Sequence, residues 1–251
     1  MKFLFTNKIL KFVLWGAVLV FMGFGVQWLS YERQPLPEAV AALESDNVVT
    51  ITREPWLTFS PNQTAPTTGF IFYPGGRISY LGYSDVMRSI SEYGYLVVVP
   101  KMPLNIAFTA PNIADDIIAA YPEIKHWVIG GHSVGGTFAA QYTFKHPENI
   151  DGVAIWSSYP ADSNDISTFD IPVVLMYGSR EVGVTDESVG VRKHLLPADT
   201  SYIVIEGGDH HQFGSYALTN EEDLATVSRE VQHEQILAAM LDLLMKAAAL
   251  Q

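Results

Sequence analysis

The fold is decided by the stretch HWVIGGHSVGGTFAAQYTFK, which occupies residues 126–145. Its first four residues form a short apolar run typical of a buried β-strand, and Thr137 to Lys145 have the pattern of a helix that ends before Pro147. Between them lies Gly131-His132-Ser133-Val134-Gly135, a G-x-S-x-G pattern placed on a strand-to-helix turn. Glycines on both sides of the serine allow strand and helix to approach closely. This pattern predicts that Ser133 is a nucleophile.

Apolar strands alternate with helical segments on both sides of this turn. Continuous apolar strands separated by helices indicate an α/β fold, with a mostly parallel sheet covered by helices on both faces. Two short strands that precede the alternation predict an antiparallel edge. We expect strands at Val48–Thr52, Trp56–Ser60, Gly69–Tyr73, Tyr95–Val99, His126–Ile129, Val153–Ser157, Val173–Tyr177 and Tyr202–Glu206, and helices at Ser84–Tyr93, Asn112–Ala120, Thr137–Lys145, Val189–Leu195 and Glu221–Ala248.

Composition narrows the class of protein. Of the 251 residues, 48% are hydrophobic and 17% charged, which indicates a compact globular domain and not a disordered chain. The formal net charge of −12 repels phosphate backbones, so nucleic acid is not an expected partner. The chain has no cysteine, which excludes disulfides, thiolate zinc sites and a cysteine nucleophile.

The N-terminal segment is strongly apolar. Lys2, Lys8 and Lys11 precede an apolar run from Phe12 to Leu29, and with the two apolar residues before Lys11 the run reaches about 20 residues, or roughly 30 Å as a helix. We therefore expect a transmembrane helix within a membrane anchor at residues 1–31. A cleaved signal peptide, which would leave a secreted protein, is the alternative, although no A-x-A-like site follows the run.

The charges that flank this segment predict its orientation. Lysines precede the run and the neutral pair Glu32 and Arg33 follows it, so we expect a single-pass protein with a cytoplasmic N-terminus and a main domain on the extracytoplasmic side. Pro35 and Pro37 indicate a linker at residues 32–44. The remaining residues, 45–251, would form one domain.

Four blocks of sequence carry a resemblance to a known family. They occur in this order: Phe72-Tyr73-Pro74-Gly75-Gly76, Gly131 to Gly135, Tyr177-Gly178-Ser179-Arg180-Glu181 and Gly207-Gly208-Asp209-His210. From Gly69 to the C-terminus the chain resembles the α/β-hydrolase superfamily, and within it the small bacterial hydrolases of the dienelactone-hydrolase-like group. The resemblance implies a Ser–acid–His triad on an α/β-hydrolase fold.

The resemblance also implies which residues complete the triad. The base follows the last strand, where His210 is favoured and the adjacent His211 stays open. The acid follows the preceding strand, where Glu181 stands at the place of the usual aspartate, with Asp186 as the alternative. The chain has no helical pattern of metal-binding histidines, so no metal site is expected. The triad mechanism requires no organic cofactor, so none is expected either.

The family stabilises the substrate oxyanion with two backbone N–H groups. One belongs to the residue after the nucleophile, here Val134, and the other to an early loop, where we expect Gly76, with Arg77 as the alternative. The family often has His-Gly in this loop, whereas this chain has Pro74-Gly75. The chain thus departs from the family pattern at the oxyanion loop as well as at the acid.

The expected activity is hydrolysis of a carboxylic ester by acyl transfer to water. The short polar loop from Ser158 to Thr168 leaves no room for the large lid that the family often inserts there, so a small-molecule ester is the expected substrate. Lactones, thioesters and amides stay open, because the same triad serves them. A membrane-anchored binding protein without catalytic activity is the competing hypothesis. Nothing in the sequence indicates the oligomeric state.

Overall fold

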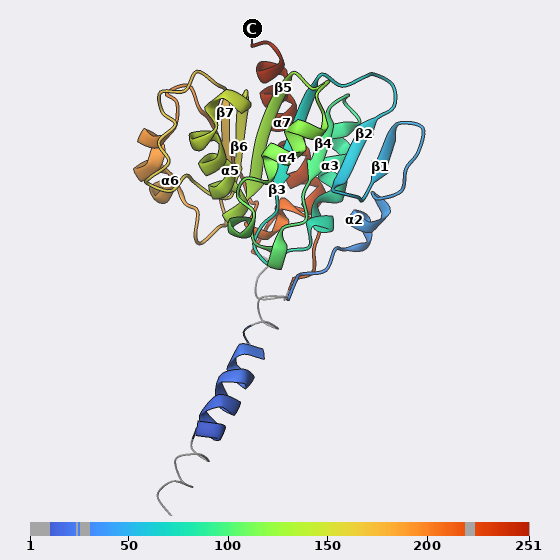
Figure 1. Ribbon diagram of the computed structural model, residues 1–251. Helices are drawn as coiled ribbons and strands as arrows, with labels where there is room; N and C mark the ends of the chain where they lie inside the picture. Colours follow the sequence, from blue (N-terminus) through green and yellow to red (C-terminus); the bar gives the residue numbers. More distant parts are fainter. Residues whose placement is uncertain (1–10, 24, 26–30, 219–223, 251) are drawn as a thin grey trace, which may run out of the picture.

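The sheet is built as the apolar pattern predicts. The computed structural model describes residues 11–23, 25, 31–218 and 224–250 (Figure 1). Its eight-stranded sheet has the order β1-β2-β4-β3-β5-β6-β7-β8. The pairs β1–β2 and β2–β4 are antiparallel and the other pairs are parallel, so the predicted antiparallel edge is present. The strands are β1 Val49–Thr52, β2 Leu57–Pro61, β3 Thr68–Tyr73, β4 Leu96–Val99, β5 His126–His132, β6 Gly152–Trp156, β7 Val173–Gly178 and β8 Ser201–Ile205.

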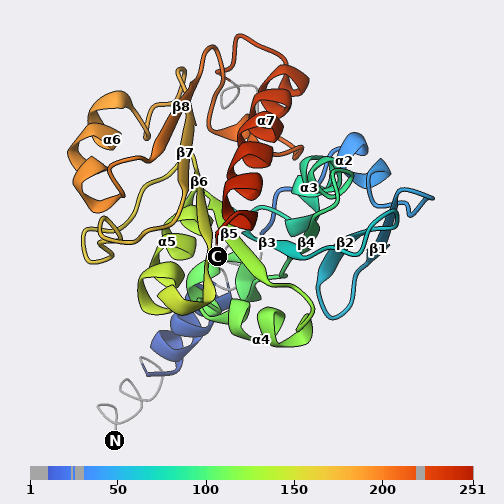
Figure 2. The same ribbon diagram turned by 90° about the horizontal axis from the view of Figure 1, so that it is seen from above.

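Helices cover both faces of this sheet, as Figure 2 shows. On β3, Phe70 and Phe72 point into one core and Ile71 and Tyr73 into the other, because successive side chains of a strand alternate between faces. The first core is completed by α3 and α7, and the second by α4, α5 and α6. The helices are α2 Pro37–Ala41, α3 Ser84–Ser91, α4 Ile113–Ala120, α5 Val134–Lys145, α6 Asp186–Arg192 and α7 Arg229–Ala248.

The last helix is shorter than its apolar pattern suggests. It begins at Arg229, where the Ser228 side chain accepts a hydrogen bond from the Val231 N–H and caps the first turn. Residues 224–228 are not helical, and residues 221–223 of the predicted helix lie outside the described residues. A capping serine therefore sets the start of α7.

Residues 32–44, predicted as a linker, pack against the domain. The Arg33 N–H donates to the Arg77 oxygen at 2.8 Å, and the Leu36 N–H donates to the Ser215 oxygen at 2.9 Å. Pro37 begins α2, a position that proline suits because the first helical N–H needs no partner. Ala39, within α2, and Leu43, four residues further along the chain, are both buried. This burial fastens the segment to the domain.

The predicted membrane anchor is only partly described. Residues 11–23 are helical, whereas residues 1–10, 24 and 26–30 lie outside the described residues. No helix within the described part of the chain has both the length and the apolarity needed to cross a bilayer, so this part does not support the predicted transmembrane helix.

The segment between β6 and β7, which is described throughout, contains neither helix nor strand. No lid domain is therefore inserted at this point. The parallel strands β3, β5, β7 and β8 end at one edge of the sheet, and the loops that follow them carry the predicted site residues.

Candidate active site

Ser133 lies at the junction of β5 and α5 in a strained backbone conformation. Its φ is 55° and its ψ −126°, a combination that residues other than glycine rarely adopt. The turn is tight because Gly135 has no side chain: a Cβ there would lie 2.1 Å from the Tyr73 oxygen. The Ser133 N–H donates to the Trp156 oxygen at 2.9 Å, which ties the turn to β6. The side chain is thus held at the carboxyl edge of the sheet and is partly exposed.

The two predicted oxyanion donors lie next to each other. A Cβ built on Gly76 would be 3.1 Å from Val134 Cγ1, so the loop after β3 touches the first residue of α5. In the described part of the chain, the N–H groups of Gly76 and Val134 have no hydrogen-bond acceptor. The Arg77 N–H, the alternative donor, is instead bonded to the Asn105 oxygen at 2.8 Å. Gly76 and Val134 therefore have N–H groups available for a substrate oxygen.

The loops after β7 and β8 bring Glu181 and His210 together. Glu181 Oε2 lies 3.3 Å from His210 Nδ1, and the carboxylate is fully buried while a third of the imidazole is exposed. Glu181 Oε1 accepts the Gly178 N–H at 2.7 Å. This second bond holds the Glu181 carboxylate in place on the Nδ1 side of the His210 ring. The Nε2 atom of the ring points away from Glu181.

The alternative acid and base lie elsewhere. Asp186 begins α6, where its Oδ1 accepts the Tyr177 hydroxyl at 2.6 Å. The His211 N–H donates to Asp209 Oδ1 at 2.9 Å, and the His211 ring lies edge-on to the His210 ring and to the Tyr216 ring. Of the residues that the sequence left open, the structure pairs His210 with Glu181.

A buried carboxylate shapes the loop that carries His210. Asp209 Oδ1 accepts the N–H groups of His211 and Gln212, and Oδ2 accepts the Leu224 N–H, each at 2.9 Å. Gln232 Oε1, on α7, accepts the Asp209 N–H at 3.1 Å, and Gln232 Nε2 donates to the Asp209 backbone oxygen at 2.9 Å. These bonds fix the turn after β8 and thus the direction of the imidazole beside it.

Two residues that the sequence analysis did not single out contact the candidate site. One is Ser157, directly after β6, whose Oγ contacts both Nδ1 of His210 and Oε2 of Glu181. No sequence signal marks it, because a serine after an apolar strand is ordinary. The other is Tyr83. A buried tyrosine is ordinary among the aromatic side chains of a core, so the sequence gives no sign of its role.

Tyr83 and His132 connect the loop after β3, the serine turn and the loop that carries His210. Tyr83 Oη accepts the Gly75 N–H at 3.1 Å and lies 2.9 Å from His132 Nδ1, and His132 Nε2 lies 2.9 Å from the His210 oxygen. Burial, and then the nearby His210 and His211, lower the pKa of His132 well below its ordinary value, so this ring is neutral. Burial raises the pKa of Tyr83, so its hydroxyl keeps its proton and donates to His132 Nδ1. His132 then donates from Nε2 to the His210 carbonyl.

The structure contains no hydrogen bond between Ser133 and His210. The residue beside the serine, His132, has its ring centroid 4.7 Å from that of His210, so the two loops are in direct contact. Catalytic hydrogen bonds are often long in unliganded enzymes and close when substrate binds.

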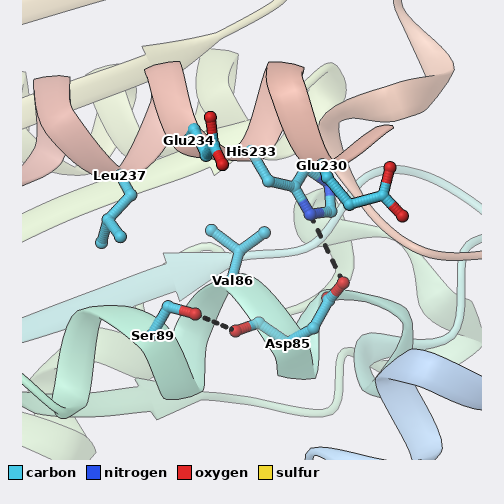
Figure 3. A pocket seen from close by; sticks show the side chains of 7 residues that line it. All are labelled: Asp85, Val86, Ser89, Glu230, His233, Glu234 and Leu237. Carbon is cyan, nitrogen blue, oxygen red and sulfur yellow. Dashed lines mark hydrogen bonds and ion pairs between the residues drawn. The ribbon is translucent and has the colours of Figure 1, made fainter. Parts of the chain in front are cut away.

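A cavity of about 300 Å³ opens beside His210. It is lined by Arg180, Glu181, Val182, Gly183, Asp209, His210, His211 and Leu224. A second cavity, of about 240 Å³, lies between α3 and α7 and contains none of the candidate site residues (Figure 3). There His233 Nδ1 is 3.4 Å from Asp85 Oδ2, which also accepts the Ser215 hydroxyl at 2.6 Å. In the described residues, no group of three or more histidine, aspartate or glutamate side chains is placed to hold a metal ion.

Comparison with known proteins agrees with this architecture. A model of the alpha/beta hydrolase family matches residues 69–234, about two thirds of the chain. This chain belongs to that family. The match spans the serine turn and the loops with Glu181 and His210, and the dienelactone-hydrolase-like subgroup remains a prediction. No curated protein matches the chain significantly in sequence.

Solved structures show the same fold at low sequence identity. A predicted CIB-like hydrolase of Thermoplasma acidophilum is 15% identical with a TM-score of 0.59, over 78% of this chain and 99% of that one. Est1E of Butyrivibrio proteoclasticus, solved with ferulic acid bound, is 14% identical with a TM-score of 0.55, over 78% and 99%. The thermophilic esterase Est2 of Thermogutta terrifontis is 11% identical with a TM-score of 0.53, over 84% and 93%. These structures share the α/β-hydrolase fold with this chain.

Proposed function

We propose that this protein is a serine hydrolase that cleaves carboxylic esters, with Ser133 as nucleophile, His210 as base and Glu181 as acid. The observation that carries the proposal is the buried Glu181 carboxylate on the Nδ1 side of His210, which leaves Nε2 directed away from the acid. The strained Ser133 turn contacts the same loop through His132. The similar structure of Est2 from Thermogutta terrifontis, which is named as an esterase, favours an ester as substrate.

The reaction takes place in two halves. His210 Nε2 takes the Ser133 proton while Oγ attacks the ester carbonyl, and the N–H groups of Val134 and Gly76 bind the oxyanion. The tetrahedral intermediate collapses, and the alcohol leaves with the proton from His210. Water then gives a proton to His210 and attacks the acyl-enzyme, and the collapse of the second intermediate returns that proton to Ser133 and releases the acid. Glu181 stabilises the imidazolium in both halves.

We infer a small or medium acyl group, because no lid is inserted between β6 and β7 to enclose a larger one. Hydrolysis of a lactone, thioester or amide uses the same groups and is the alternative activity. The competing proposal, a binding protein without catalysis, rests on the departures at Pro74 and Glu181 from the family pattern.

The test is hydrolysis of nitrophenyl esters of increasing chain length, together with labelling by a fluorophosphonate. We expect turnover and labelling in the wild type, and a loss of at least about 10³-fold in kcat with no labelling in Ser133→Ala. Ser163→Ala, which alters an exposed serine, is the matched control and should behave as wild type. A folded wild type that is neither labelled nor active on any ester would favour the binding protein.

We also propose that the N-terminal segment attaches the protein to a membrane, with the hydrolase domain on the extracytoplasmic side. The described part of this segment exposes large apolar side chains, such as Phe12, Trp15 and Phe21, that no other part of the described structure covers. Membrane fractionation of the full chain and of a chain that begins at Tyr31 is the test. Recovery of the full chain in the soluble fraction would refute the attachment.

A further inference from the structure

Ser157 occupies a position between the proposed base and the proposed acid. We propose that Ser157 is a positioning residue, whose hydroxyl joins His210 to Glu181 and holds the imidazole with its proton on Nδ1. This inference rests on the roles proposed for His210 and Glu181 and adds a fourth side chain to their arrangement. Ser157 does not reach the substrate, because its side chain lies behind the imidazole and is buried.

The three polar groups determine the direction of each hydrogen bond. Ser157 Oγ lies 2.5 Å from Glu181 Oε2 and also contacts His210 Nδ1, whereas the direct distance from Nδ1 to Oε2 is 3.3 Å. An ionised carboxylate only accepts, so the single hydroxyl proton points to Glu181. The lone pairs of Oγ then face Nδ1, which must carry a proton to bind them. The hydroxyl thereby selects the tautomer that leaves Nε2 free to act as base.

The backbone of Ser157 is held in a conformation that directs the side chain to this place. Its φ is 47°, in the left-handed region that residues other than glycine seldom adopt. The Ser157 N–H donates to the Met176 oxygen of β7 at 2.7 Å, which fastens the strained residue to the sheet. Strain of this kind is found where a side chain must be aimed at a functional site.

The neighbouring serine makes different contacts. Ser158 Oγ lies 2.9 Å from the Thr137 hydroxyl on α5, and it contacts neither His210 nor Glu181 in the described structure. The two adjacent serines are both buried, have the same chemistry and differ in their partners. Ser158→Ala is therefore a matched control for Ser157→Ala.

The arrangement has a consequence for catalysis. When His210 takes the Ser133 proton, the imidazolium keeps its Nδ1–H bonded to Ser157, and Ser157 keeps its own proton on the side of Glu181. No proton moves along this chain, and the hydroxyl transmits only the stabilising effect of the carboxylate. Without the hydroxyl, the ring retains one longer contact to Glu181 and is less well oriented.

The first experiment separates kcat from KM. Loss of hydrogen bonds to charged groups predicts that Ser157→Ala and Ser157→Gly each lower kcat by roughly 10- to 100-fold, with KM unchanged. The glycine variant accepts the positive φ without strain, so it keeps the test valid if the alanine variant folds poorly. Ser158→Ala should keep its kcat. Wild-type kcat in both Ser157 variants would overturn the inference.

The second experiment asks whether Ser157 acts through Glu181. In a Glu181→Gln background the further change Ser157→Ala should lower kcat far less than it does in the wild type, because the carboxylate that the hydroxyl serves is gone. Equal fold-changes in the two backgrounds would show that Ser157 acts independently of Glu181, and the inference would be wrong.

The third measurement needs no activity. Proton NMR should show a low-field Nδ1–H resonance in the wild type that is absent in His210→Ala, and in Ser157→Ala that resonance should move upfield or disappear. An unchanged resonance in Ser157→Ala would refute the inference even if the ester proposal holds. If no ester is hydrolysed and Ser133 is not labelled, the proposed function fails, and this resonance alone decides whether Ser157 holds the ring.

Discussion

The Tyr83 hydroxyl connects segments that are far apart in the chain. It accepts the Gly75 N–H and donates to His132, which in turn donates to the His210 carbonyl. Since Tyr83 is buried, water cannot replace these bonds. The Tyr83 hydroxyl thus connects the loop with Gly75 to the loop with His210 through His132.

We predict that Tyr83→Phe lowers kcat by roughly 10-fold, because the Gly75 N–H and the His132 ring lose a buried partner. Tyr216→Phe is the matched control, since the Tyr216 hydroxyl is buried and has no hydrogen-bond partner in the described structure. Ester hydrolysis and thermal unfolding of both variants form the test. Equal kcat in the two variants would remove the proposed connection between the loops.

At the scale of elements, α3 and α7 are joined through Asp85. Burial favours a raised pKa for Asp85, but the hydrogen bond and charge of His233 and the bond from Ser215 outweigh burial and hold this pKa below its ordinary value. Asp85 lies on α3 and also accepts the hydroxyl of Ser215, which follows the loop with His210 in the chain.

A carboxyl whose pKa is lower in the folded than in the unfolded state stabilises the fold above its unfolded pKa, and this stabilisation is lost as the pH falls through the folded pKa. We predict that Asp85→Asn lowers the free energy of unfolding by about 1–3 kcal/mol at pH 7, and that the difference shrinks below about pH 3.9. Urea unfolding at several pH values measures it.

The exposed Asp242, which pairs with Lys246 on α7 at 2.7 Å, provides the control. Asp242→Asn should change stability by less than about 1 kcal/mol at pH 7, because exposed ion pairs contribute little. An Asp85→Asn variant as stable as Asp242→Asn at neutral pH would contradict a stabilising role for the junction.

At the scale of the whole molecule, residues 31–44, which precede β1, pack against the rest of the hydrolase domain. The Arg33 N–H donates to the Arg77 oxygen, and the Ser79 N–H donates to the Arg33 oxygen at 3.0 Å. The guanidinium carbon of Arg77 lies over the Tyr31 ring, 5.3 Å from its centroid. These contacts lie directly after Gly76. The oxyanion loop is therefore supported from behind by residues that precede the sheet in the chain.

We predict that a chain beginning at Tyr31 keeps the full ester kcat, whereas a chain beginning at Pro37 loses about 10-fold because the oxyanion loop loses its backbone partners. Steady-state kinetics of the two truncated proteins, with circular dichroism to verify folding, measure the effect. Equal kcat in both chains would show that this support is dispensable.

Much of the architecture follows from the sequence alone. Apolar runs and their spacing predicted all eight strands and the antiparallel edge, because burial on both faces of a parallel sheet requires continuous apolar strands. The glycines around Ser133 predicted the tight turn, because their effect on the backbone is local. The chain order of the strands then placed the candidate loops at one edge of the sheet.

Only the tertiary structure decided which side chains meet. It paired Glu181 with His210 where Asp186 and His211 were open, assigned the Arg77 N–H to Asn105, and placed Ser157 between base and acid. It also packed residues 32–44 onto the domain. The reason is physical: sequence spacing determines which residues a loop carries, but the direction of each side chain depends on backbone partners from distant strands, such as the Met176 oxygen that holds Ser157.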